Sequence, residues 1–228
     1  MSGVRIGLAL ARERMRGPSA PLVLLLSCLA LFSIGALERQ SDAASAADDA
    51  LGGAVFGIAL PLLAYFVSER TCDGKRLAHS VEVVARHGTD RRAALLGLQL
   101  ASAAFTALAG ALLTIFALLG AHAPRSQALL GDLRASVGIA LVAGVVYALY
   151  FGAASLLGRR GGGRKWALIV DFMLGTSASA LAMPWPRGHV RNLLGGEPVV
   201  DLSQASAWLA LGVIGIVCLA SSVLRTAE

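Results

Sequence analysis

Few residues of this 228-residue chain have the types and spacing that chemistry requires. The glycine-rich basic run over residues 161–165 lacks the GxxxxGK[ST] order that holds nucleotide phosphates, and no buried strand precedes it. The sequence has no G-x-S-x-G, H-E-x-x-H or C-x-x-C, the spacings of serine hydrolases, zinc proteases and thiol or metal sites. The histidines lie in predicted loops (His79, His87, His122 and His189). We therefore expect no catalytic residues, no metal and no cofactor in this chain.

Asp171 is the only charged residue well inside an apolar stretch. An intramembrane carboxylate is a candidate contact for a proton or a substrate. It follows Lys165 by about a turn and a half of helix, so it is also within reach of the polar interface, or of pairing with Arg164 or Lys165. We favour the structural role, because proton-coupled transport usually uses more than one such group.

Six apolar stretches must position these residues. They cover residues 19–37, 51–67, 93–120, 135–158, 166–183 and 207–224. Each is near or above the length that crosses a hydrocarbon core ~30 Å thick at ~1.5 Å per helical residue. The composition, 56% hydrophobic and 15% charged, lies outside the range of soluble domains. The sequence therefore predicts an all-α integral membrane protein, with six transmembrane helices in one domain over residues 1–228.

Lys and Arg residues alternate between rich and poor connecting segments. The N-terminal segment, the connections 68–92 and 159–165, and the C-terminal end together hold 15 of the 20 basic residues. By the positive-inside rule these segments are cytoplasmic, which places both termini inside and the chain in the cell (inner) membrane. The same polarity explains the net charge of +6 without a nucleic-acid partner, and predicts attraction to anionic membrane lipids instead.

Residues 1–17 are predicted to form an amphipathic elbow helix in the inner headgroup region. An apolar set at helical spacing (Val4, Leu8, Ala11 and Met15) lies beside a basic stripe (Arg5, Arg12 and Arg16). Gly17 and Pro18 then break the helix before the first span. Residues 22–37 followed by the small residues 43–47 also resemble a signal peptide with its cleavage site. We expect this span to be retained, because its apolar core is long for a signal and its basic flank is itself organised.

The connection 68–92 is the longest one on the predicted cytoplasmic side. Leu77, Val81, Val84 and Ala85 recur at helical spacing, and Gly88 suits the residue that ends a helix. Thr89 or Asp90 is then placed to cap the third span. The pattern predicts a short amphipathic helix that lies parallel to the membrane and is large enough to dock a partner.

Glycines and prolines predict two further features. Gly52-Gly53-x-x-x-Gly57 is a spacing that lets helices approach closely, and Pro61 is expected to kink the second span. Residues 184–202 stay partly apolar, which predicts short helices at the outer interface with Trp185 as an anchor.

Residues 79–91 carry a family resemblance. They read His-Ser-Val-Glu-Val-Val-Ala-Arg-His-Gly-Thr-Asp-Arg, directly before the third span. This resembles the cytoplasmic loop of ABC transporter permeases of the exporter (type-2) class, which shows a G-T-L-E-L-L-like stretch and then a P-[VI]-S-R-like turn. Ser80, Val81, Glu82, Val83 and Val84 match the first part, and Arg91 falls on the family's arginine. The chain departs from the pattern at His79, where the family has Gly, and at Gly88, where it has Pro.

The resemblance implies a role for the whole chain. Residues 75–91 would be a coupling helix that docks in a cleft of a separate ATP-binding subunit, and that subunit would hold ATP and Mg. The chain would be a permease subunit, and two permease subunits, identical or different, would form the export pathway. The elbow, the six spans and the semi-apolar last outer loop agree with the architecture of this family.

Three other readings stay open. A haem-exporter-like permease has a similar size and number of spans. A non-transporting membrane scaffold or assembly protein would also lack catalytic groups, but it would not need residues 75–91 to bind an ATPase. A secondary transporter is the weakest reading, because residues 1–120 and 121–228 show no internal repeat and the spans hold one charge.

Overall fold

The computed structural model describes residues 2–124 and 126–225, which form helices and their connections without a strand. In chain order the elements are α1 (Gly3–Met15), α2 (Ser19–Ser41), α3 (Ala46–Asp49), η1 (Ala50–Ala59), α4 (Leu60–Thr71), α5 (Leu77–Ser80), α6 (Glu82–Arg86), α7 (Arg91–Ala121), α8 (Ala128–Ala154), η2 (Arg159–Gly161), α9 (Gly163–Leu174), η3 (Ala180–Ala182), α10 (Pro186–Leu193), η4 (Val199–Asp201) and α11 (Gln204–Leu224). The prediction of an all-α protein is confirmed.

Five helices of the described chain are long and apolar enough to cross a membrane. They are α2, the continuous helix Ala46–Thr71, α7, α8 and α11. Five of the six predicted stretches therefore form such helices. The prediction of one continuous helix over 166–183 is wrong, because α9 ends at Leu174 and its 12 residues span only about 18 Å. A Cβ atom on Gly175 would lie 2.7 Å from the Cβ of Arg187, so α10 occupies the space that a continuing helix would need.

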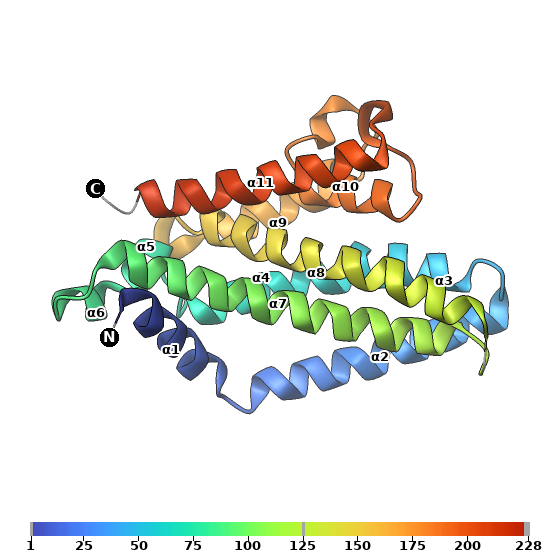
Figure 1. The fold of residues 1–228 in the computed structure, drawn as a ribbon, viewed down its shortest axis with the longest axis horizontal. Coiled ribbons are helices and arrows are strands. Elements are labelled where there is room, and N and C mark those ends of the chain that lie inside the picture. The colour runs from blue at the N-terminus through green and yellow to red at the C-terminus, as the bar shows by residue number, and fades with distance from the viewer. Residues whose placement is uncertain (1, 125, 226–228) are drawn as a thin grey trace.

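The long helices lie side by side; from α2 to α8 successive ones run in opposite directions, whereas α11 runs in the same direction as α8 (Figure 1). As a result α1, the α5–α6 connection and the end of α11 lie at one end of the bundle, and α3 and α10 lie at the other. We call the first the basic end, because the connections richest in Lys and Arg meet there.

The centre of the bundle consists of α4, α7 and α8. More than half of the most apolar window of each is buried, against 22% for α2 and for α11. The two outer helices expose rows of apolar side chains, on α2 (Leu22, Leu25, Leu26 and Leu29) and on α11 (Leu209, Val213, Ile216 and Val217). These rows suit contact with hydrocarbon or with another apolar helix.

Glycines bring α7 into backbone contact with its neighbours. A Cβ atom on Gly97 would lie 2.1 Å from the carbonyl oxygen of Val4 in α1, and one on Gly120 would lie 2.1 Å from that of Phe32 in α2. The close approach predicted at Gly52 and Gly53 is absent, because a Cβ atom there meets nothing within 4 Å.

The second span departs from regular α-helix before its proline. Residues Ala50–Ala59 form a π-helix, and the N–H of Leu60 donates to the carbonyl oxygen of Val55. Pro61 stands in the first turn of the α-helix that follows. The predicted distortion therefore lies in the wide turns that precede the proline.

We expect Gly97→Ala to destabilise the protein by about 1–3 kcal/mol, because the new methyl group meets backbone that cannot move aside cheaply. Gly138→Ala in α8 is the matched control: its Cβ atom enters open space, so it should leave stability unchanged or raise it slightly. Thermal unfolding of both variants in detergent checks the difference. Equal unfolding temperatures would contradict the α1–α7 contact.

Candidate functional site

The predicted coupling segment folds as two short helices, α5 and α6, at the basic end (Figure 1). Sequence reasoning predicted one helix, but the chain leaves helical geometry at Val81, where φ is −110° and ψ is 5°. The Val81 side chain is completely buried, and Ser80 Oγ donates to the carbonyl oxygen of Leu77 at 2.6 Å. The backbone bends so that Val81 enters the core, which a single straight helix over the surface would not allow.

The inner side of this segment is packed on the bundle. Leu77 and Val81 are buried in one cluster with residues of α1, α7 and the end of α4 (Ala11, Cys72, Ala94, Leu95 and Leu98), and Val84 is packed at its edge. The predicted apolar stripe is therefore confirmed at these positions.

The outer side of the segment is open. None of the α6 residues is buried, and Val83 keeps 68% of its surface exposed. Glu82 forms an ion pair with Arg86 at 2.6 Å, and the hydrogen bond from this guanidinium lowers the pKa of the Glu82 carboxyl. Glu82 and Val83 are thus presented to the outside while Val81 anchors the same turn.

Three side chains, two of arginine and one of aspartate, fix the segment to α1 and α7. Arg91 Nη2 donates to the carbonyl oxygen of Ala78 at 2.9 Å, and Arg14 Nη2 donates to that of Ser80 at 2.7 Å. Gly88 has φ of +82°, which ends α6, and Asp90 accepts from the N–H of Arg92 at 3.0 Å, which starts α7. The structure therefore brings the predicted coupling residues together in one braced unit.

Arg164 makes the deepest ionic contact at the basic end. Its side chain is 1% exposed, and Nη2 lies 2.8 Å from Glu69 Oε2 of α4. Arg164 Nη1 also donates to the carbonyl oxygen of Ser68 at 3.2 Å. The predicted pairing of Asp171 with Arg164 or Lys165 is wrong, because Asp171 lies about 10 Å further along α9 and has other partners.

Asp171 is fully buried. Its Oδ2 accepts from the hydroxyl of Tyr147 at 3.1 Å, and its Oδ1 accepts from the backbone N–H of Arg187 at 3.3 Å. The carboxylate joins α8, α9 and α10. This geometry supplies a structural role and shows no catalytic pairing.

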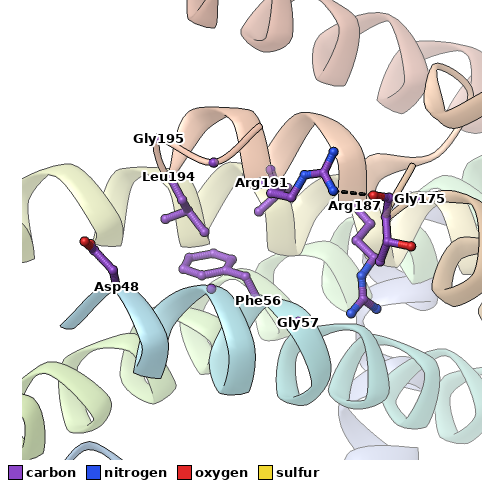
Figure 2. A pocket seen from close by; sticks show the side chains of 12 residues that line it. Asp48, Phe56, Gly57, Gly175, Arg187, Arg191, Leu194 and Gly195 are labelled. Atoms are coloured by element: carbon purple, nitrogen blue, oxygen red, sulfur yellow. Dashed lines mark hydrogen bonds between the residues drawn. The ribbon is translucent and has the colours of Figure 1, made fainter. Parts of the chain in front are cut away.

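A cavity of about 310 Å³ lies beside this cluster, between the π-helix, the end of α9 and α10 (Figure 2). The Arg187 guanidinium lies 4.3 Å from the centre of the Phe172 ring, and its Nη1 is buried without a hydrogen-bond partner. Arg191 donates to the carbonyl oxygen of Thr176, drawn as a dashed line in Figure 2. The cavity has the polarity to hold a small polar group, with Asp48 at its other side.

Among the described residues, no three His, Cys, Asp or Glu side chains gather as a metal site would require. Cys72 is buried, which raises the pKa of its thiol and keeps it protonated.

Sequence reasoning missed two side chains of these clusters. Arg14 had a signal: at 100° per residue it lies opposite the basic stripe of α1, on the face that packs inward. Arg187 had none, because its contact with Asp171 depends on how α10 meets α9.

Comparison with known proteins adds no relative: no family model, no curated protein and no solved structure matches this chain.

We expect Glu69→Gln to destabilise the protein by about 1–3 kcal/mol, because it leaves the buried guanidinium of Arg164 without its anion. The double variant with Arg164→Met should recover much of this loss, since neither charge then remains buried. Glu13→Gln breaks an exposed pair with Arg16 and should have little effect. Thermal unfolding measures the stability of the three variants. A double variant less stable than Glu69→Gln would contradict the pairing of Glu69 with Arg164.

We expect Asp171→Ala to cost about 1–3 kcal/mol of stability, because the Tyr147 hydroxyl and the Arg187 N–H lose a buried acceptor. Combined with Tyr147→Phe, the loss should be less than additive. Asp171→Asn keeps an acceptor and should unfold close to the wild type. An Asp171→Ala variant as stable as the wild type would contradict the structural role.

Proposed function

We propose that this chain is the membrane-spanning permease subunit of an ATP-driven ABC exporter of the type-2 class. In this proposal α5 and α6 form the coupling element, and a separate subunit binds ATP and Mg and hydrolyses ATP. The observation that carries the proposal is the two-sided nature of this segment: Val81 is completely buried in the bundle, whereas Val83, two residues later, is mostly exposed.

The contacts of the segment suit a lever. Force applied to α6 reaches α7 through Arg91 and through the buried cluster around Val81. It reaches α1 and the end of α4 through Arg14, which also donates to the carbonyl oxygen of Thr71. Closure of an ATP-binding subunit on α6 would therefore act on α7, α1 and α4 together. The free energy of that binding would favour one of the two arrangements of the bundle over the other.

The topology supports six crossings with cytoplasmic termini. Both α8 and α11 run toward the basic end, so residues 155–203 must return across the bundle between them (Figure 1). We assign this return to α9 and to the shorter elements up to α10. By the positive-inside rule the basic end faces the cytoplasm of a bacterial-type inner membrane, where an ATP-binding subunit is accessible.

A second permease subunit, identical or different, completes the pathway in this proposal. One such bundle has a packed centre of α4, α7 and α8, so a route for a large substrate requires a second copy. The exposed apolar rows of α2 and α11 offer faces for it or for lipid.

The alternatives receive less support. A scaffold protein gives no reason for a braced helix with an open face at the basic end. For a haem-exporter-like permease, the outer histidines are poorly placed: His189 is fully buried and contacts the carbonyl oxygen of Met183 at 2.8 Å, and His122 lies 2.8 Å from the Asp132 carboxylate.

Val83→Asp tests the coupling element with little effect on folding, because this side chain is exposed. We expect the purified wild type to retain an ATP-binding-cassette subunit, and Val83→Asp to reduce the amount recovered at least tenfold, because a charge enters the docking face. Mild-detergent affinity purification followed by mass spectrometry measures it.

Leu130→Asp is the matched control, since Leu130 is 65% exposed at the opposite end of the bundle. It should leave the recovery unchanged. If wild type and Val83→Asp recover the same ATPase equally, the docking face is wrong. If the wild type recovers no ATPase, the permease function is wrong and the scaffold reading gains.

A further inference from the structure

The turn between α8 and α9 borders a strongly basic groove. Its volume is about 820 Å³, and it brings together cationic side chains from two distant connections (Lys75, Arg76, His79, Arg159 and Arg160). The lining includes no carboxylate, although Lys75 Nζ pairs with Asp73 Oδ2 at 2.8 Å beside it. The positive-inside rule requires basic residues on this side of the membrane, but it does not require that they converge on one groove.

The backbone of the turn holds this arrangement. Arg76 Nε donates to the carbonyl oxygen of Gly158 at 2.7 Å, which joins the two connections. Gly158 and Arg160 have φ of +75° and +52°, so the turn reverses tightly into α9. The first turn of α9 carries no acidic residue, although the partial charge of a helix N-terminus is positive. An anion in the groove would relieve the mutual repulsion of these groups.

An apolar groove begins at the same turn. It has a volume of about 500 Å³ and runs between α8, α9 and α11, with Gly158 and Leu157 near the basic groove and Val170 and Trp185 further along. Two of its side chains are largely open, Leu157 with 54% and Trp166 with 69% of their surface exposed. Its length lies along helices that face the hydrocarbon region.

We propose that the two grooves together bind one anionic phospholipid of the inner leaflet. The headgroup phosphate lies in the basic groove, and an acyl chain lies in the apolar groove. A free phosphate would use only the first groove and a second copy of the chain only the second. An amphiphile with an anionic head matches both, at the depth where phospholipid headgroups are located.

The bound headgroup bridges the α8–α9 turn to the connection that leads into α5. Anionic lipid therefore steadies the start of the coupling segment. The site belongs to this chain alone, so it does not depend on the proposed ATP-binding subunit.

The test uses the purified full chain in detergent, with short-chain phosphatidylglycerol, short-chain phosphatidylcholine or inorganic phosphate added. We expect phosphatidylglycerol to raise the unfolding temperature by about 5 °C, and the other two additives to have little effect. Arg159→Gln/Arg160→Gln should remove most of this increase. The control variant Arg5→Gln/Arg12→Gln removes the same charge from exposed positions of α1. Its unfolding temperature should still rise with phosphatidylglycerol as that of the wild type does.

Trp166→Ala separates the acyl groove from the headgroup groove, and should weaken the effect of phosphatidylglycerol at unchanged net charge. Equal stabilisation by phosphatidylcholine, or by inorganic phosphate, would overturn the proposal. So would an equal loss in Arg5→Gln/Arg12→Gln, which would indicate unspecific attraction. If Trp166→Ala instead converts a dimer to a monomer without changing the response to lipid, a second copy occupies the apolar groove.

Discussion

Backbone contact along α7 is the constraint on which the other helices depend. Without a hydrophobic driving force between helices inside a bilayer, packing requires close approach, and glycine permits it. Gly97 brings α1 against the start of α7, and Gly120 brings α2 against its end. A Cβ atom on Gly144 in α8 would lie 2.6 Å from the Cα atom of Ala107 in α7. One long helix therefore orients α1, α2 and α8.

This geometry concentrates charge at the basic end. Since α1 lies on α7, Arg14 is directed into the gap between the end of α4 and α5, where carbonyl oxygens of both accept from it. The turn of α8 into α9 then places Arg164 against Glu69. The connections at the basic end are thus tied to helices that are distant in sequence, while α6 keeps an open face. A partner that pushes on this end would contact α6 first and would act on the bundle through it.

Much of this fold was predictable because a membrane leaves few choices. Apolar length gives the spans, and the distribution of Lys and Arg gives their alternation. The stripe of Leu77 and Val81 correctly indicated which side of the coupling segment is buried. The partners of Asp171 and Arg164 were not predictable, because pairing across helices depends on rotation and depth that a single sequence does not specify. Small-residue spacing was equally ambiguous: it occurs at Gly52 and Gly53, where the structure leaves open space.

The failure at α9 is instructive, because a helix that stops inside a membrane exposes carbonyl oxygens that must find donors within the protein. Here the donors come from the chain that returns. Arg191 donates to the carbonyl oxygens of Thr176 and Ser177, and the N–H of Val200 donates to that of Ala178 at 2.9 Å. Arg191 of α10 donates to carbonyl oxygens that lie just beyond Leu174, the last residue of α9. The chain that leaves the half-length helix thus finds donors in a polar side chain 15 residues after Thr176, where a continuing helix would have supplied them from its own backbone.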